Sequence, residues 1–502
     1  SSFIEELYSV LNNSTLTCKR TSREYTTSAV VVICLLSFFA VLAFIGSSIT
    51  ALEYWMNISP STESVYGNSI SERAMINGEA YSLSNKKSDD VLFINKANAL
   101  PEWLEKCKPF FNCFCIFTNG EKILNTTSSE GQLPCLHGIR FLSMSWVILC
   151  HTYTMLPVSI RNKTVFADIL NHWIFEVVLS GGFAVDSFFV LSGFLVAYLY
   201  FKQCSKNGGK IPWLYFYVHR YIRLTPVYMI VLAYFTTLYT YSNSGPLWPD
   251  YDVDANCKTG WWWNLLYISN FQSEKTHCMS WSWYLANDMQ FYIISPLLLI
   301  SLWRWPKIGY SLMGLIFAIS FSAYFAITYK YDYDVTIESI AAKGSVNFQG
   351  MMDKFTDFTN KTYTKPYTRI SPYLVGILLA YFLHRRKQND SPKLNTITLS
   401  VGWIVASSIT LACVFGLYNR QQTLIEACFY NSLSRTCFAC GIAWVVFVCV
   451  ADQGGIVNSI LSWEVWIPLS RLTYCAYLVH PMVLQYAFLS IRKMFEYSLI
   501  TM

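Results

Sequence analysis

The sequence predicts an all-α membrane protein, a polytopic bundle of about ten transmembrane helices around a central polar cavity. Three observations support this fold class. Only 14% of the 502 residues are charged, against roughly 25% in soluble domains, and 53% are hydrophobic. Charge-free intervals long enough to cross a hydrocarbon core of about 30 Å recur along the chain. A few ionisable residues lie inside these intervals, and such residues usually face a bundle interior or a water-filled cavity.

The N-terminal part divides into three segments before the main bundle begins. Residues 1–27 are polar, and residues 28–52 carry no charge and predict one transmembrane helix. Residues 53–137 form a loop that begins with a stretch rich in Ser, Asn, Lys and Glu, a composition typical of low order. Within this loop, residues 100–118 mix Trp, Phe and Cys with Lys and predict an amphipathic helix on the membrane surface. The main transmembrane domain is expected over residues 138–495.

Further charge-free intervals predict the helices of this main domain. They cover residues 141–160, 177–201, 224–249, 289–303, 308–329, 370–383, 394–419, 436–451 and 472–491. The first interval contains His151, the second contains Asp186 and the last contains His480, while Asp288 precedes the fourth. Together with residues 28–52 they give about ten transmembrane helices.

Basic residues in short connections predict the orientation of the bundle, because cytosolic loops carry an excess of Lys and Arg. Such residues gather at 202–223, 304–307 and 385–387, in connections that alternate consistently along the chain. These connections are therefore expected in the cytosol. The N-terminus is then extracytosolic, with the protein in the endoplasmic reticulum or the plasma membrane.

The connections on the opposite side carry sequence signals for glycosylation and for a disulfide. Sequons at Asn13, Asn162 and Asn360 fall there and are candidate glycosylation sites. Cys257 and Cys278 flank one extracytosolic loop. A disulfide between them is expected, because such bonds persist in oxidising compartments.

The stretch HGIRFLSMSWVILCHTYTM, residues 137–155, places Arg140 and His151 on one predicted helix. At 100° per residue their separation leaves both on one face, roughly 16 Å apart along the axis. Arg140 is then expected near the membrane surface and His151 near mid-depth. An ionisable residue at that depth is costly, which makes His151 a candidate functional residue. The structural alternative is a histidine hydrogen-bonded to a neighbouring helix.

Two acids and a second histidine are further candidates. Asp186, in GGFAVDSFFVLSGFL, is either a helix-end hydrogen-bonding group or an orienting, proton-handling partner for a histidine. Asp288, in WSWYLANDMQFYIISP, lies among aromatic residues, which suggests a buried or interfacial acid. His480, which precedes Pro481, is either a second polar group in the cavity or part of a helix-end hydrogen bond.

Arg220 and Arg223 in HRYIRLTP are three residues apart, a spacing that puts both guanidinium groups on one helix face. Arginine forks suit phosphate oxygens, so this cytosolic pair could hold a phosphorylated donor. Anchoring to lipid headgroups is the alternative.

Other functional classes lack their sequence signals. The chain has no P-loop and no glycine fingerprint for dinucleotides. Its net charge of +6 is spread along the loops, which disfavours nucleic-acid binding. Cys437 and Cys440 have two-residue spacing without a second ligand pair, so no metal site is predicted.

Taken jointly, these motifs resemble the membrane-bound acyltransferase-3 family over roughly residues 134–495. The resemblance rests on Arg140 and His151 with ten residues between them, on the Arg-x-x-Arg pair, and on the stretches VDSFFVLSGFL and MQFY. The N-terminal span, the polar loop and the phrase CLHGIRFLSMSWVILCHTY are similar to the animal branch named nose resistant to fluoxetine. That branch has a lumenal, cysteine-containing N-terminal domain, of which residues 1–27 would be an extracytosolic stub.

The resemblance implies an O-acyltransferase that moves an acyl group from cytosolic acyl-CoA to a hydroxyl acceptor in contact with membrane lipids or the far side of the membrane. His151 would be the catalytic base, because histidine titrates near neutral pH, and Asp186 and Asp288 would complete the catalytic set. Asp288 is a departure, because bacterial relatives often carry glutamate there. The shorter carboxylate could still orient a base or could signal changed chemistry. The residues implied to hold acyl-CoA are Arg140, Arg220, Arg223 and His480.

Two other functions are compatible with the same residues. A transporter or lipid-handling protein could keep the polar cavity without catalysis, since intramembrane ionisable residues also mark substrate and proton pathways. The sequence shows no clear inverted repeat of broken spans, which disfavours a transporter. An inactive family member acting as a scaffold is the third interpretation. The identity of the acceptor and the length of the acyl chain cannot be derived from the sequence.

Overall fold

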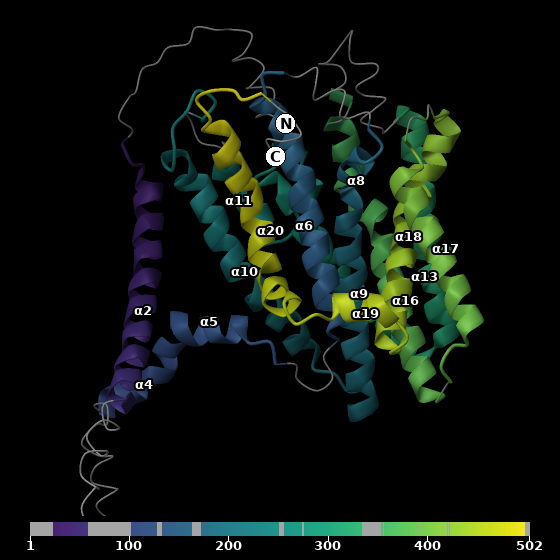
Figure 1. Ribbon diagram of the computed structural model, residues 1–502, viewed down its shortest axis with the longest axis horizontal. Coiled ribbons are helices and arrows are strands. Elements are labelled where there is room, and N and C mark those ends of the chain that lie inside the picture. Colours follow the sequence, from purple (N-terminus) through teal and green to yellow (C-terminus); the bar gives the residue numbers. More distant parts are fainter. Residues whose placement is uncertain are drawn as a thin grey trace, which may run out of the picture. The chain divides into compact units, whose positions relative to one another are not determined.

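The computed structural model describes residues 24–58, 102–127, 133–162, 172–249, 256–273, 276–333, 353–354, 356–390, 392–418, 420 and 422–496. The chain forms two compact units, one of residues 25–125 and one that consists mainly of residues 126–502. In the described ranges the secondary structure is helical, and the single β-bridge pairs Ile160 with Phe495. The predicted all-α class is therefore confirmed for this part of the chain (Figure 1).

The smaller unit consists of α2 (Thr27–Ile58), α4 (Glu102–Asn112) and α5 (Ile116–Leu124). α2 is long and apolar enough to cross a membrane, as its charge-free sequence predicts. The turn between α4 and α5 is attached to α2 because the Ile116 amide donates to Ser47 Oγ at 3.0 Å. The Thr50 hydroxyl also lies 3.2 Å from the Cys115 thiol. The N-terminal stub with Asn13 and the polar loop over residues 59–101 lie outside the described residues.

In the described part of the larger unit, long helices run beside one another (Figure 1). They are α6 (Cys135–Met155), α9 (Gly182–Asn207), α10 (Trp213–Thr237), α12 (Trp283–Arg304), α13 (Pro306–Tyr331), α16 (Pro366–Gln388), α17 (Thr396–Phe415), α18 (Leu424–Val450) and α20 (Trp466–Leu489). Short connecting helices are α8 (Phe175–Leu179), α11 (Cys257–Leu265) and α19 (Gly455–Leu461). Single turns are η2 (Leu156–Val158), η3 (Tyr239–Tyr241), η4 (Ser269–Phe271), η6 (Ser280–Ser282) and the π-turn η7 (Thr359–Tyr363).

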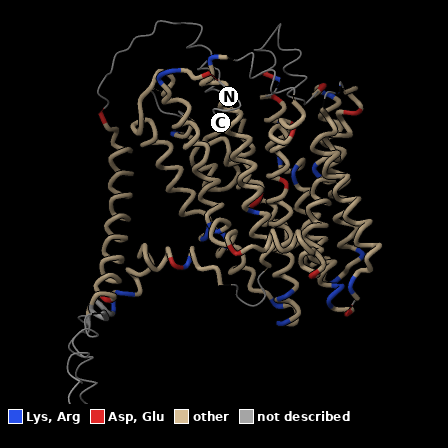
Figure 2. The backbone as a smooth tube through the Cα atoms, in the orientation of Figure 1, with Lys and Arg blue, Asp and Glu red and all other residues tan. Residues whose placement is uncertain are grey.

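Among the described residues, seven helices are long and apolar enough to cross a membrane: α2, α6, α9, α12, α13, α17 and α18. α10, α16 and α20 have similar lengths but are not among these seven. Most charges lie near helix ends, and a few lie in the middle of the larger unit (Figure 2). The expected number of about ten transmembrane helices therefore remains a prediction.

α10 and α18 show the largest differences between the observed start of a helix and the start of its charge-free interval. α10 begins at Trp213 rather than at residue 224, and α18 begins at Leu424 rather than at residue 436. Both predicted starts were wrong for the same reason, because a charge was equated with the end of a helix. In the structure Arg220, Arg223 and Arg435 lie inside these helices and face other polar groups of the bundle.

The packing of α9 against α16 forms the centre of the larger unit. A Cβ atom at Gly193 would overlap the Tyr373 carbonyl, and one at Gly376 would overlap the Val190 carbonyl. Glycine at both positions therefore lets the two backbones approach closely, as small residues do between membrane helices. The large apolar cluster around this contact buries residues such as Phe194 completely and so holds α9 against its neighbours.

The predicted disulfide and the glycosylation signals have different outcomes. The Cys257–Cys278 disulfide is present and confirms that prediction. Asn162 is the last described residue before a gap, so the rest of its sequon lies outside the described residues. Asn360 lies in η7 and lines an internal cavity, while Thr362 of its sequon is fully buried and donates to the Phe358 carbonyl at 2.6 Å. Glycosylation of Asn360, whose side chain is half-buried, therefore stays a prediction.

Candidate active site

The larger unit encloses a cavity of about 1350 Å³ that is lined mainly by α6, α9, α10, α12 and α20. His151 and both arginines of the Arg-x-x-Arg pair line this same cavity. The helix face predicted to carry Arg140 and His151 is therefore the cavity-facing side of α6. The cavity is large enough for a ligand of several hundred daltons, since typical small-molecule sites measure about 300–1,000 Å³.

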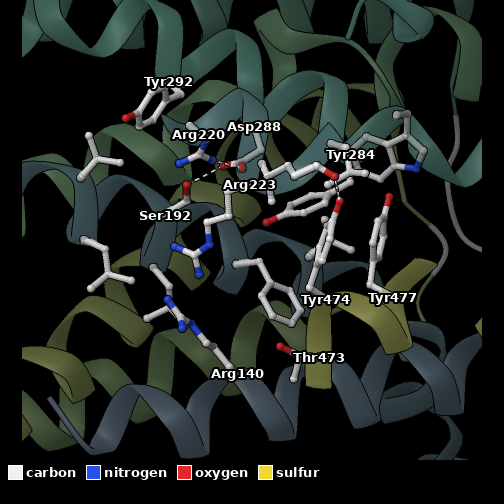
Figure 3. Close-up of a pocket in the computed structure, with 18 of the residues that line it drawn as sticks. Arg140, Ser192, Arg220, Arg223, Tyr284, Asp288, Tyr292, Thr473, Tyr474 and Tyr477 are labelled. Atoms are coloured by element: carbon white, nitrogen blue, oxygen red, sulfur yellow. Dashed lines mark hydrogen bonds and ion pairs between the residues drawn. The ribbon is translucent and has the colours of Figure 1, made fainter. Parts of the chain in front are cut away.

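One half of the cavity is strongly basic; we call it the basic half. Its cationic lining residues are Arg140, Lys202, Lys206, Arg220, Arg223 and Arg471. Asp288 is the one acid among the described residues that line the cavity. Figure 3 shows the side chains of Arg140, Arg223 and Arg220 following one another between α6 and Asp288. Such an excess of positive charge in a cleft with low-dielectric walls attracts a polyanionic ligand.

Arg220 and Asp288 form an ion pair across α10 and α12. The Ser192 hydroxyl of α9 donates to the other carboxylate oxygen of Asp288 at 2.5 Å, so that carboxylate accepts from two helices. The Arg220 guanidinium also lies over the Tyr292 ring, 4.1 Å from its centre. Arg220 is consequently neutralised and held in place. Arg140 and Arg223 form no ion pair within the described part of the chain, so their charges remain available to a ligand.

His151 forms a hydrogen-bonded pair with His480 of α20. His151 Nδ1 lies 2.8 Å from His480 Nε2, and the planes of the two rings are nearly parallel. His480 Nδ1 lies 2.9 Å from the Tyr477 carbonyl oxygen and 3.1 Å from that of Ala476. Carbonyl oxygens only accept, so His480 Nδ1 carries the proton and its Nε2 accepts from His151 Nδ1. In the neutral pair His151 Nε2 is then left without a proton and can act as a base.

This arrangement changes the role expected for His480. The resemblance implies that His480 contacts acyl-CoA. In the structure His480 is buried and is absent from the residues that line the cavity, so its position does not support such a contact. Its partners are one imidazole and the backbone of its own helix. Neither the proline that follows His480 nor the apolar interval around it predicts a partner on α6.

Asp186 also has partners that the sequence did not predict. Its two carboxylate oxygens each lie 2.9 Å from an arginine, Arg369 of α16 and Arg435 of α18. Asp186 and Arg369 are completely buried, and Asp186 is absent from the residues that line the cavity. The expected histidine partner is thus replaced by two arginines. Each arginine bounds an interval that was predicted to be a membrane span, which was the available signal for the pairing.

The Asp186 cluster, defined as Asp186, Arg369 and Arg435, supports one wall of the cavity. The Arg369 guanidinium lies 4.1 Å from the ring centre of Tyr363 and 4.9 Å from that of Trp283. Both aromatic rings line the cavity. The cluster therefore acts on the cavity through these rings and not through contact with a ligand.

The end of the cavity remote from Lys202 and Lys206 has an uncharged lining; we call it the uncharged end. It is lined by Gln272, His277, Ser280, Thr359, Asn360 and Thr364. His277 is 6% exposed, and its burial, with a smaller contribution from Lys365, lowers its pKa to about 4. His277 is therefore neutral at physiological pH. In the described residues no group of three or more His, Cys, Asp and Glu side chains is arranged to hold a metal ion.

Comparison with known proteins adds evidence to this geometry. A family profile described as an acyltransferase domain matches residues 133–493. The chain belongs to the acyltransferase-3 family. It is 36% identical to nose resistant to fluoxetine protein 6 of Caenorhabditis elegans over 413 residues, which are 78% of this chain and 49% of that protein. It is 26% identical to regulator of hypoxia-inducible factor 1 of the same species, over 74% of each chain.

Bacterial proteins are similar as well. Staphylococcus aureus proteins whose names describe them as O-acetyltransferases are 26% identical over 365 residues, 70% of this chain and 51% of theirs. The chain thus spans about half the length of these proteins and of nose resistant to fluoxetine protein 6. No solved structure matches it.

Proposed function

We propose that this protein is an integral membrane O-acyltransferase that transfers an acyl group from acyl-CoA to a hydroxyl acceptor, with His151 as the base. The observation that carries the proposal is the His151–His480 pair, whose His151 lines the same cavity as arginines without ion pairs. The family membership and the names of the staphylococcal relatives support acyl transfer as the reaction class.

The basic half of the cavity is suited to the phosphate groups of acyl-CoA. Arg140 and Arg223 offer free guanidinium forks, which bind phosphate oxygens through two parallel hydrogen bonds. Lys202 and Lys206 extend this positive lining along α9. The excess of basic residues in the neighbouring connections favours the cytosolic side for this half, where acyl-CoA is available. The flexible arm of the donor then runs roughly 16 Å along α6, from the level of Arg140 to that of His151.

Each proton and electron pair in the transfer step has a defined destination. His151 Nε2 takes the proton of the acceptor hydroxyl while its oxygen attacks the thioester carbonyl. The tetrahedral intermediate collapses, the carbon–sulfur bond breaks, and the new ester forms. The thiolate of CoA leaves and receives the proton from His151. His480 keeps the ring of His151 in the required tautomer and orientation, the task that a carboxylate performs in serine hydrolases.

The two acids act as positioning residues in this proposal. Asp288 holds Arg220 in place beside the donor site, and Ser192 fixes the carboxylate of Asp288. Asp186 supports the cavity wall through Arg369 and its aromatic neighbours. Within the described residues, neither carboxylate forms a hydrogen bond with His151 or His480.

The test is turnover of radiolabelled acetyl-CoA by the purified full chain in detergent, with separate measurement of transfer and of hydrolysis. His151→Gln should lower both rates at least a hundredfold, because general-base catalysis contributes about 10²–10⁴. His480→Gln should lower them less, since it removes orientation alone. His384→Gln is the matched control, because His384 is a histidine outside the cavity that stacks on Phe201 and Trp303. Undiminished turnover in His151→Gln would refute the proposal and favour a transporter or lipid-handling protein, which needs no base.

A further inference from the structure

The uncharged end of the cavity contains two buried polar atoms without a hydrogen-bond partner. They are Nε2 of His277 and Oε1 of Gln272. Both residues line the cavity. A buried polar atom without a partner costs about 1–3 kcal/mol, and native proteins retain few of them. Two such atoms from one loop at the same end of one cavity indicate a place where a ligand completes the hydrogen bonding.

The surrounding structure keeps these two residues in a fixed position. The Cys257–Cys278 disulfide lies next to His277, and the Asn264 amide donates to the Cys278 carbonyl at 3.0 Å. Asn270, two residues before Gln272, donates to Asn287 at 2.6 Å and accepts from Gln290 at 2.8 Å. The chain next to His277 is therefore tied to α11 by the disulfide, and the chain next to Gln272 is tied to α12 by side-chain amides. A polar site with such support is preorganised.

Charge separates this end from the basic half. The residues that line it are uncharged, and His277 is neutral at physiological pH. The nearby ammonium group of Lys365 donates to the Asn270 carbonyl at 2.5 Å. An anionic ligand would find its counter-charges in the basic half. The uncharged end instead presents an amide oxygen and an imidazole nitrogen, the complement of a hydroxyl group, which both donates and accepts.

We propose that Gln272 and His277 bind a hydroxyl group of an uncharged acceptor and determine acceptor specificity. The acceptor enters from the uncharged end while the donor occupies the basic half, and the hydroxyl to be acylated reaches His151 between them. This inference rests on the proposed function for its meaning, but the two residues are outside the donor site and the histidine pair.

The experiment measures binding of methyl β-D-glucopyranoside to the purified full chain in detergent by saturation-transfer NMR. The wild-type protein should bind this glycoside. His277→Ala and Gln272→Ala should each weaken binding about tenfold, the effect of one hydrogen bond lost from a buried site. His277→Gln should recover part of the affinity, since its amide also donates and accepts. His384→Ala is the matched control, because His384 Nε2 is also buried without a partner but lies outside the cavity, and binding should be unchanged.

A parallel measurement of acetyl-CoA binding and hydrolysis in the same variants separates this inference from the proposed function. Both should remain at the wild-type level in His277→Ala and Gln272→Ala, with an unchanged thermal midpoint. Loss of acetyl-CoA turnover in the wild type would count against the proposed function alone. No glycoside binding by the wild type, equal binding by the alanine variants, or equally strong binding of methyl glucuronoside, the anionic analogue, would overturn the acceptor site.

Discussion

Asp186 and Asp288 are both carboxylates inside the helical bundle, yet the structure uses them differently. Asp186 is fully buried between two arginines and lies outside the cavity. Asp288 pairs with Arg220, accepts from Ser192 and lines the cavity. The sequence surroundings of the two acids are similarly apolar and aromatic. A buried carboxylate is therefore informative about function only when its partners and its distance from the ligand space are known.

This contrast predicts that the Asp186 cluster controls stability. Asp288, with its partners Arg220 and Ser192, should control donor binding instead. The largest expected effect is on stability. Asp186→Asn leaves Arg369 buried without its counter-charge and should destabilise the protein by about 3–5 kcal/mol. The measurement is the thermal midpoint of the purified chain by intrinsic fluorescence. Asp288→Asn should lower the midpoint much less, because Asp288 lines the cavity and Arg220 can there be reached by solvent. Equal losses of stability would remove the distinction between the two acids.

The next effect concerns the affinity for the donor. Arg223→Gln should weaken acetyl-CoA binding roughly tenfold, because it removes a charge-assisted contact to phosphate. The thermal midpoint should stay unchanged, since Arg223 has no ion pair within the described residues. Titration calorimetry with acetyl-CoA gives the dissociation constant. Arg369→Gln provides the opposite pattern, a lower midpoint with wild-type affinity in the molecules that remain folded. Unchanged affinity in Arg223→Gln would support anchoring to lipid headgroups instead.

The smallest expected effect comes from the hydroxyl that fixes Asp288. Ser192→Ala removes one hydrogen bond to the carboxylate and should raise the KM for acetyl-CoA about threefold, with little change in kcat. Steady-state kinetics resolve a change of this size. Ser187→Ala is a suitable control, because Ser187 is a buried serine of the same helix that does not line the cavity. A fall in kcat rather than a rise in KM would place Ser192 in the chemical step.

Much of the fold and part of the site follow from local sequence. Charge-free intervals locate the long helices, and the spacing of Arg140 and His151 predicts that they share a face, which is the face that lines the cavity. The disulfide follows from two cysteines that flank one loop. These inferences succeed because each depends on residues close together in the chain.

The remaining features depend on partners far apart in sequence. Asp186 meets Arg369 where Gly193 and Gly376 let α9 and α16 approach closely, and it meets Arg435 because α18 also packs against α9. His480 meets His151 because α20 packs against α6. The start of α10 could not be predicted either, because a helix can continue through an arginine when an acid such as Asp288 lies opposite. Tertiary contacts decide these pairings and this helix start, and they cannot be predicted from a single sequence.

The most direct test of the account is an electron cryo-microscopy structure of the full chain with a nonhydrolysable thioether analogue of acetyl-CoA. We expect phosphate density against Arg140 and Arg223, and the acyl end of the analogue beside the ring of His151. Phosphates bound elsewhere, or an arm that stops at the basic half without reaching His151, would contradict it.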